Sequence, residues 1–260
     1  VLATAASQWA LRRNLNTVAK EGDGHHLDVK QIASLKSAKS AALKKISPKG
    51  EGKYVPRISL TGGPCGGKSS SMNHLKEAMV KIGYDVYFVP EVPTILMNGG
   101  CQYPGADGGK ALEEFEDALM ALQLQMERSF VQIASSTGHP SVVVYDRGLM
   151  DIKAYLPPQL WNELLVRMNT SEKELLGRYD AVVHLVTAAN GAEKFYTLKQ
   201  AGGESTRSET AEQARALDDK ILDCWKGHPH HIVVGNDSSF EGKLEAATKQ
   251  VVDAVKALEG

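Results

Sequence analysis

Short apolar runs alternate with longer amphipathic segments over most of the chain, beginning at Arg57. β-Branched and aromatic residues dominate the runs, as is typical of strands, and Gly or Pro residues often follow the segments between them. Those segments contain many good helix formers. The pattern predicts strands over residues 57–61, 85–90, 141–146, 181–186 and 231–235. It predicts helices over residues 68–82, 112–136, 157–168, 172–178, 209–225 and 240–258.

Two of the apolar runs indicate how the sheet is built. The runs SVVVYD (141–146) and AVVHLV (181–186) are almost continuously apolar, so both of their faces must be buried. Strands of this kind that alternate with helices are typical of a parallel sheet covered by helices on both faces. Apolar residues make up 42% of the chain, an ordinary globular value that is sufficient for a core of this type. We therefore expect an α/β domain over residues 54–260.

Residues 1–53 differ from this domain in charge and are expected to form a separate arm. Residues 1–57 carry 11 Lys/Arg and 4 Asp/Glu, a net charge of +7, whereas the rest of the chain carries 19 and 27, a net charge of −8. Residues 29–46 have the spacing of an amphipathic helix, and residues 47–56 have the composition of a linker. We predict a basic arm that docks on a protein partner, with membrane or nucleic-acid contact as alternatives. The overall charge of −1 gives no strong nucleic-acid signal.

The cysteines and the hydropathy of the chain indicate the cellular compartment of the protein. Cys65, Cys101 and Cys224 have no paired spacing, which favours a reducing compartment over a zinc site or a disulfide framework. No apolar run approaches the roughly 18 residues that a transmembrane helix needs. We expect a cytoplasmic protein. Residues 1–20 contain Arg and Ser but no acidic residue, so the remnant of an organelle transit peptide is the alternative.

The segment GGPCGGKS matches the phosphate-binding pattern GxxxxGK[ST] between a predicted strand and a predicted helix. Glycines let the backbone bend so that amide groups face phosphate oxygens, and the N-terminus of the following helix favours an anion. Lys68 is placed to reach the outer phosphates, and the Ser69 hydroxyl is a ligand for Mg²⁺. The predicted nucleotide-binding residues are Gly62, Gly63, Pro64, Cys65, Gly66, Gly67, Lys68, Ser69 and Ser70.

Three charged residues follow the apolar strands and are the candidates for chemistry. Asp146 ends its strand, and carboxyl ends of parallel strands face the ligand crevice, so this carboxylate is predicted to hold Mg²⁺ and its hydration shell. Arg147 either meets developing phosphate charge or pairs with a carboxylate. Glu91 follows the second strand and either takes a proton from an acceptor hydroxyl or has a structural or Mg²⁺-linked role.

Several segments together resemble the NadR/TRPL-translocation-defect-type P-loop family, whose members are described as AAA-like ATPase or kinase domains. The resemblance runs over residues 57–258 and rests on the segments LTGGPCGGKSS, VYFVPE, VVVYDRGLMD, HLVTAANGAEKFYTL and TRSETAEQARALDDK. It implies a P-loop NTPase fold with a kinase-type sheet of five parallel strands in the order 2-3-1-4-5.

The resemblance also implies a lid between the fourth strand and the next helix, at residues 188–208. Arg207 resembles a lid arginine that meets the phosphates, and Asn236 stands where relatives place a base-contacting residue. Asn190 and Tyr196 also lie in the lid segment 188–208, and no role is assigned to them. Glycines at 191, 202 and 203 suit a segment that closes on its ligand.

Three functions remain open from the sequence. The first is an ATP- or GTP-binding protein with slow Mg²⁺-dependent hydrolysis or switch activity. The second is a kinase for a nucleoside-like small molecule, and the third is an assembly subunit that retains nucleotide. The sequence has no NKxD-type guanine motif, so it does not determine whether the nucleotide is ATP or GTP. The Gly-rich stretch 97–109 does not indicate which molecule would accept the phosphate.

Overall fold

The computed structural model describes residues 54–105, 107–196 and 210–258. The predicted arm at residues 1–53 lies outside the described residues. So do most of the predicted lid and its arginine, Arg207.

A single sheet of five parallel strands forms the centre of the domain, in the order β2-β3-β1-β4-β5. This is the order that the resemblance implies, and the α/β prediction is confirmed. The strands are β1 (Arg57–Thr61), β2 (Asp85–Val89), β3 (Ser141–Asp146), β4 (Ala181–Leu185) and β5 (His231–Val234).

The three inner strands are buried because helices cover both of their faces. Side chains alternate across each strand, so Val142 and Val144 pack on one face while Val143 and Tyr145 pack on the other. All five residues of β4 are buried, whereas the edge strands β2 and β5 are only partly buried. The two almost continuously apolar runs of the sequence, 141–146 and 181–186, are therefore inner strands.

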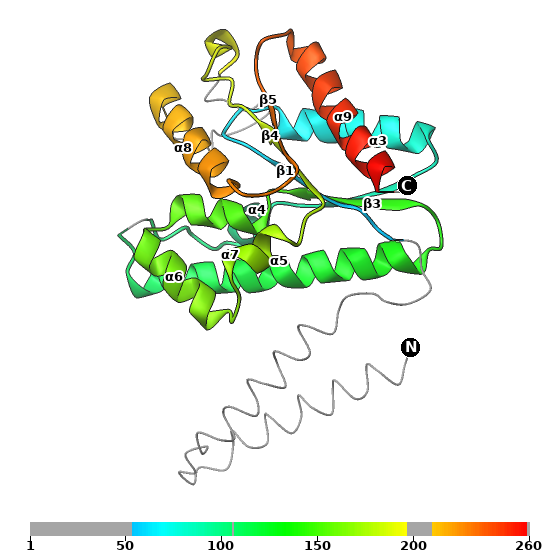
Figure 1. The fold of residues 1–260 in the computed structure, drawn as a ribbon. Helices are drawn as coiled ribbons and strands as arrows, with labels where there is room; N and C mark the ends of the chain where they lie inside the picture. Colours follow the sequence, from blue (N-terminus) through cyan, green and yellow to red (C-terminus); the bar gives the residue numbers. More distant parts are fainter. Residues whose placement is uncertain (1–53, 106, 197–209, 259–260) are drawn as a thin grey trace, which may run out of the picture. The chain divides into compact units, whose positions relative to one another are not determined.

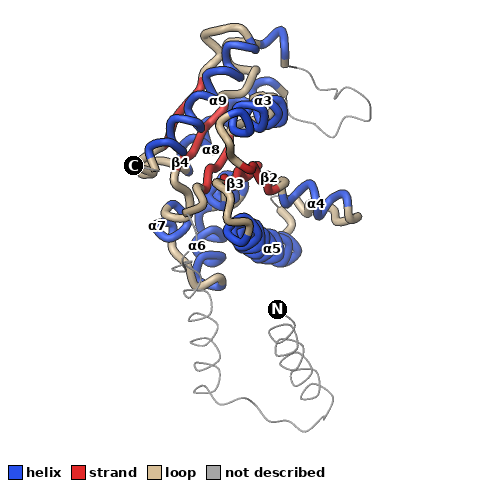
Figure 2. Tube along the Cα trace, turned by 90° about the vertical axis from the view of Figure 1, so that its right-hand side faces the viewer, coloured by secondary structure: helices blue, strands red, loops and turns tan. Residues whose placement is uncertain are grey.

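Figures 1 and 2 show α3 and α9 on one face of the sheet and α5 with α6 and α7 on the other. Leu75 and Val251 bring α3 and α9 into one apolar cluster, and Leu112 and Trp161 bring α5 and α6 into the second. The α-helices are α3 (Lys68–Lys81), α4 (Val92–Asn98), α5 (Lys110–Ser136), α6 (Pro158–Arg167), α7 (Glu172–Leu176), α8 (Ala211–Cys224) and α9 (Phe240–Ala257).

Three short elements that follow strands were not expected from the sequence. The helix α4 begins directly after Glu91 with a proline in its first turn, where the missing amide donor costs nothing. The 3₁₀ helix η1 (Leu149–Tyr155) follows β3, and a shorter one, η2 (Glu193–Phe195), follows β4. These elements are too short for a helical period to be recognised in the sequence.

The carboxyl ends of the strands lie at one edge of the sheet, because all five strands run in the same direction. Residues that follow β1, β2, β3 and β4 therefore meet there, and this edge holds the candidate site. Within the described part of the chain, no helix has the length and apolar content that crossing a membrane requires.

Candidate phosphate-binding site

The glycine-rich loop connects β1 to α3 with a backbone that includes several left-handed residues. Gly62, Cys65 and Gly67 have φ values of 124°, 56° and 95°. Gly67 precedes the first turn of α3, which begins at Lys68. The free amide groups of this first turn and the positive end of the helix therefore adjoin the loop, as anion binding requires.

Two loop glycines are needed because the backbone packs against the end of β4. A Cβ atom on Gly62 would lie 2.1 Å from the carbonyl oxygen of Leu185, and one on Gly66 would lie 2.5 Å from the same oxygen. No side chain fits at such distances, and Gly62 also has a positive φ. The loop thus takes its shape from contact with its neighbouring strand.

Lys68 lies within the loop, and no carboxylate of the described residues forms an ion pair with it. Its Nζ atom donates to the carbonyl oxygens of Gly62 at 3.0 Å and Gly63 at 3.2 Å. Burial, assisted by the charge of Arg147, lowers the pKa of the ammonium to about 8. A partly buried cation whose direct partners among the described residues are carbonyl groups is well suited to an incoming phosphate, which would add a counter-charge in direct contact.

We expect nucleotide binding at about pH 8 to be accompanied by uptake of part of a proton. Lys68 is partly neutral there in the free protein, and bound phosphate raises its pKa. Affinity should consequently fall as the pH rises above about 8. Titration calorimetry in buffers of different ionisation enthalpy measures the uptake.

Lys243 provides the matched control for this proton uptake. It is a second buried lysine whose pKa burial lowers to about 8, but it donates to the Val186 carbonyl and to Asn236 instead of the loop. Uptake should persist in Lys243→Met. An uptake that disappears in this variant would assign the proton to Lys243.

Asp146 and Ser69 are the candidate donor set for Mg²⁺. The Oδ1 atom of Asp146 is buried and has no hydrogen-bond partner among the described residues. Burial raises the pKa of Asp146, and the charge of Lys68 opposes that shift. Ser69 is exposed at the start of α3. A hard cation that takes oxygen ligands would satisfy the unpartnered carboxylate oxygen, with phosphate and water oxygens completing its shell.

Glu91 and Arg147 form an ion pair beside this donor set. The guanidinium Nε atom donates to Oε1 of Glu91 at 2.5 Å, and the Thr94 hydroxyl donates to Oε2 at 2.6 Å. Burial opposes ionisation of Glu91, but Arg147 and the hydrogen bond from Thr94 hold its pKa below the usual value. Glu91 is therefore an anion at neutral pH, with both oxygens engaged.

Arg147 also connects the pair to the phosphate loop. Its φ is 71°, a conformation that residues other than glycine seldom adopt, and its carbonyl accepts from Gln123 at 3.2 Å. Its Nη1 atom lies 3.3 Å from the Gly62 carbonyl oxygen and 3.6 Å from Asp151 Oδ2. The structure thus shows the carboxylate pairing of Arg147, while its contact with phosphate stays a prediction.

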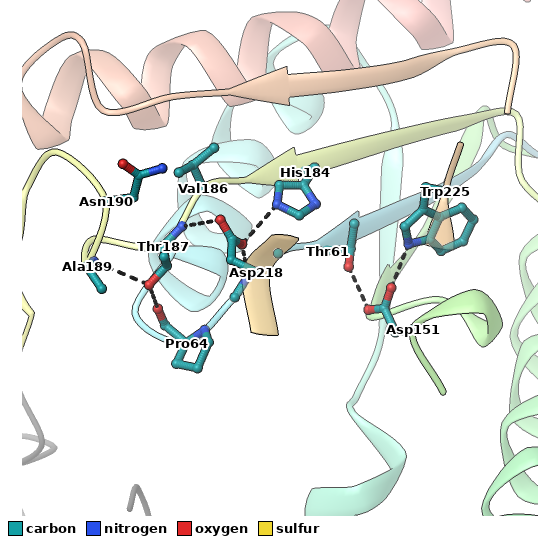
Figure 3. Close-up of polar contacts among 12 residues, drawn as sticks. Thr61, Pro64, Asp151, His184, Val186, Thr187, Ala189, Asn190, Asp218 and Trp225 are labelled. Carbon is teal, nitrogen blue, oxygen red and sulfur yellow. Dashed lines mark hydrogen bonds and ion pairs between the residues drawn. The ribbon is translucent and has the colours of Figure 1, made fainter. Parts of the chain in front are cut away.

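Asp151 is a buried residue of this region that sequence reasoning did not single out. It accepts from the Thr61 hydroxyl and from the Trp225 indole, each at 2.6 Å (Figure 3). The carboxylate thus ties the end of β1 and the end of α8 to η1. The only feature of the sequence that could have indicated Asp151 is its position next to the apolar pair Leu149-Met150. The segment has no clear helical or strand periodicity.

A second group of missed residues surrounds the loop on the β4 side. His184, Thr187 and Asp218 are all buried, and the Thr187 hydroxyl donates to the Pro64 carbonyl at 2.5 Å. Asp218 shares the buried stripe of α8 with Ala214 and Ile221. A charged residue in an apolar stripe was the signal that could have found it.

Asn236 lies beside this group, with its amide bonded to the protein. Its Nδ2 atom donates to the carbonyl oxygens of Thr187 at 2.9 Å and Asn190 at 2.6 Å, and its Oδ1 atom accepts from Lys243 at 2.8 Å. These bonds anchor the segment that follows β4. A contact between Asn236 and a nucleotide base stays a prediction.

The fold and the loop together define a P-loop NTPase-type domain. A glycine-rich loop with Lys68 follows the central strand, and Asp146 ends its neighbour in a parallel sheet of order 2-3-1-4-5. A family model described as an AAA domain matches residues 57–243, which is more than half of the chain. The chain therefore belongs to this AAA-domain family of P-loop proteins.

The fold is also similar to a structure described as the NadR protein in complex with NR. The TM-score is 0.53 at 12% sequence identity, and the match covers 78% of this chain and 52% of that one. At this identity the similarity concerns the fold alone. The chain spans about half the length of that protein. The search of curated proteins found no match.

Proposed function

We propose that this chain binds ATP or GTP together with Mg²⁺ and slowly hydrolyses the terminal phosphate, as a nucleotide-dependent switch does. The observation that carries the proposal is the buried Oδ1 atom of Asp146, which lies at the sheet edge that holds the P-loop and has no hydrogen-bond partner in the described part of the chain. A buried polar atom without a partner is costly unless a ligand completes it.

Each residue of the site has a defined part in this proposal. Lys68 and the loop amides bind the phosphates, and the first turn of α3 adds its positive end. Ser69 and Asp146 would hold Mg²⁺, which supplies charge neutralisation at the phosphate oxygens. Because positioning and charge neutralisation provide most of phosphoryl-transfer catalysis, slow hydrolysis needs no additional base.

Arg207 is proposed to close on the phosphates from the lid segment. Cys65 and Ser70 contribute as parts of the loop and of the first helical turn. The choice between ATP and GTP is left to direct titration, and the candidate contact to the base is at Asn236.

Asp146→Asn tests the metal-linked part of the proposal. Affinity for the nucleotide should fall about 10–100-fold in Mg²⁺ and much less in EDTA, because only the metal-linked contact needs the negative charge. Phosphate release should slow in parallel. Calorimetric titration with ATP and GTP, with and without Mg²⁺, measures the difference. An equal loss in both conditions would make Asp146 a structural residue.

A kinase for a small hydroxylated acceptor is the second candidate. It is favoured by the fixed, ionised carboxylate of Glu91, which follows β2 at the same sheet edge as Asp146. The structural match to a NadR protein solved with NR is compatible with this candidate. An assembly subunit that merely retains nucleotide is the remaining outcome.

A further inference from the structure

Asp218 on α8 is a buried carboxylate that contacts the P-loop from the side of β4. Its Oδ1 atom accepts from the Gly63 amide at 2.6 Å and from His184 Nε2 at 2.9 Å, and its Oδ2 atom accepts from the Thr187 amide at 3.2 Å. Figure 3 shows this carboxylate between Thr187 and His184, next to the loop. Only 5% of Asp218 is exposed.

All three partners donate, so the site is built for an anion. Burial opposes ionisation, but the hydrogen bond and charge of His184 and the two backbone amides hold the pKa of Asp218 below its usual value. An ionised carboxylate only accepts hydrogen bonds, so His184 donates to it from Nε2. Hydrogen bonds to a buried anion are stronger than those between neutral groups.

The Gly63 amide that donates to Asp218 belongs to a peptide unit whose carbonyl also makes hydrogen bonds. A trans peptide directs its carbonyl and its amide to opposite sides. The carbonyl of the same unit, that of Gly62, accepts from Lys68 Nζ at 3.0 Å and from Arg147 Nη1 at 3.3 Å. The Gly62–Gly63 peptide is thus held by an anion through its amide and by two cations through its carbonyl.

The lack of a side chain at Gly63 is explained by the same contact. A Cβ atom there would lie 2.7 Å from Asp218 Oδ1 and 2.9 Å from Asp218 Cβ. Asp218 therefore packs directly on the backbone that it orients. Through the Thr187 amide the same carboxylate also holds the segment that leaves β4.

We propose that Asp218 is a positioning residue: it orients the Gly62–Gly63 peptide so that its carbonyl holds Lys68 and Arg147 at the phosphate site. It also links the P-loop to α8 and to the end of β4, so that these elements keep one arrangement during nucleotide binding. The inference rests on the proposed nucleotide binding and deepens it, because it names the residue that sets the geometry of the loop.

Asp218→Asn keeps the shape of the side chain but cannot serve all three donors. One of its two terminal atoms becomes an NH₂ group, which would face either the Thr187 amide or the Gly63 and His184 donors. Loss of hydrogen bonds to a charged group should weaken ATP or GTP binding by about 10–100-fold per folded molecule. Each nucleotide is titrated with Mg²⁺ by calorimetry, and the tighter one is compared between variants.

Asp180→Asn is the matched control. Asp180 precedes β4 at the opposite end of the sheet, where it accepts from the Arg57 amide at 2.7 Å and from the Tyr54 hydroxyl. Like Asp218, it is a carboxylate that accepts from a backbone amide, but it is remote from the loop. This variant should leave nucleotide affinity unchanged, whatever it does to the melting temperature.

The amide NMR signal of Gly63, recorded without nucleotide, separates the inference from the proposed function. Asp218→Asn should shift this signal upfield and accelerate its hydrogen exchange, while Asp180→Asn should not. If wild type binds neither nucleotide, the proposed function fails and the Gly63 signal still tests the contact. An unchanged Gly63 signal, or an unchanged affinity per folded molecule, would overturn the positioning role.

His184→Phe covers the case in which Asp218→Asn does not fold. It removes one donor and leaves the carboxylate in place, and the Nδ1 atom of His184 is buried without a partner among the described residues. Because the carboxylate remains, the Gly63 signal should change by less than in Asp218→Asn, and the loss of affinity should be only a few-fold. If His184→Phe changes neither the Gly63 signal nor the affinity, and Asp218→Asn fails to fold, then Asp218 only stabilises the fold and has no positioning role.

Discussion

Lys68→Ala should abolish the thermal stabilisation that a nucleoside triphosphate gives to this protein. At about a hundred times its dissociation constant, a ligand stabilises the folded state by about 2.7 kcal/mol. For a domain of this size that corresponds to a shift of roughly 5–10 °C in Tm. The variant should lose this shift because it removes the cation that the loop carbonyls hold for the phosphates. Scanning calorimetry with MgATP and MgGTP measures it.

The fold itself should survive the loss of Lys68. A partly buried ammonium whose pKa is lowered to about 8 by desolvation contributes little favourable energy to the nucleotide-free protein. Lys76→Ala, on the exposed side of the same helix, is the control and should keep the full shift. An equal ligand-induced shift in wild type and in Lys68→Ala would remove the basis for the phosphate site.

The sheet could be predicted from the sequence because its inner strands are short, apolar and bounded by Gly, Pro or charged residues. Parallel strands buried on both faces leave this signature in β3 and β4, and the GxxxxGK[ST] match then fixed where the loop lies. Strand order was implied by resemblance to a family and not by the pattern itself. The helix α4 escaped prediction because it gives less than two helical turns and begins VPTI, which are poor helix formers, whereas the shorter α7 consists of good ones.

The polar contacts of the site were harder to predict because they join residues far apart in the sequence. Arg147 and Glu91 are 56 positions apart, and Asp218 and Gly63 are 155 apart. A sequence pattern shows that Asp146 ends a strand, but not which cation lies beside it. It also could not show that Arg147 would contact the loop carbonyl and two carboxylates at once. Such pairings depend on the packing of α8 and η1 against the sheet edge.

Glu91→Gln should separate a kinase from a slow hydrolase. In a kinase a carboxylate near the terminal phosphate takes the proton of the acceptor hydroxyl, and its removal costs about 10²–10⁴-fold. Glutamine keeps an oxygen that accepts from Arg147, so the contacts of Arg147 with Gly62 and Asp151 need not change. Basal hydrolysis, which depends on positioning and charge neutralisation, should therefore change much less.

The experiment uses γ-labelled ATP or GTP with a panel of nucleosides, ribosides and small polyols. Glu172→Gln is the control, because Glu172 is also an ion-paired glutamate, 2.6 Å from Lys153, but belongs to α7 and not to the loop. We expect release of phosphate that depends neither on the acceptor nor on Glu91. Label transferred to an acceptor, and lost only in Glu91→Gln, would instead establish a kinase. Tightly held nucleotide without any turnover would instead favour the assembly subunit, because every phosphate contact can support binding without hydrolysis or transfer.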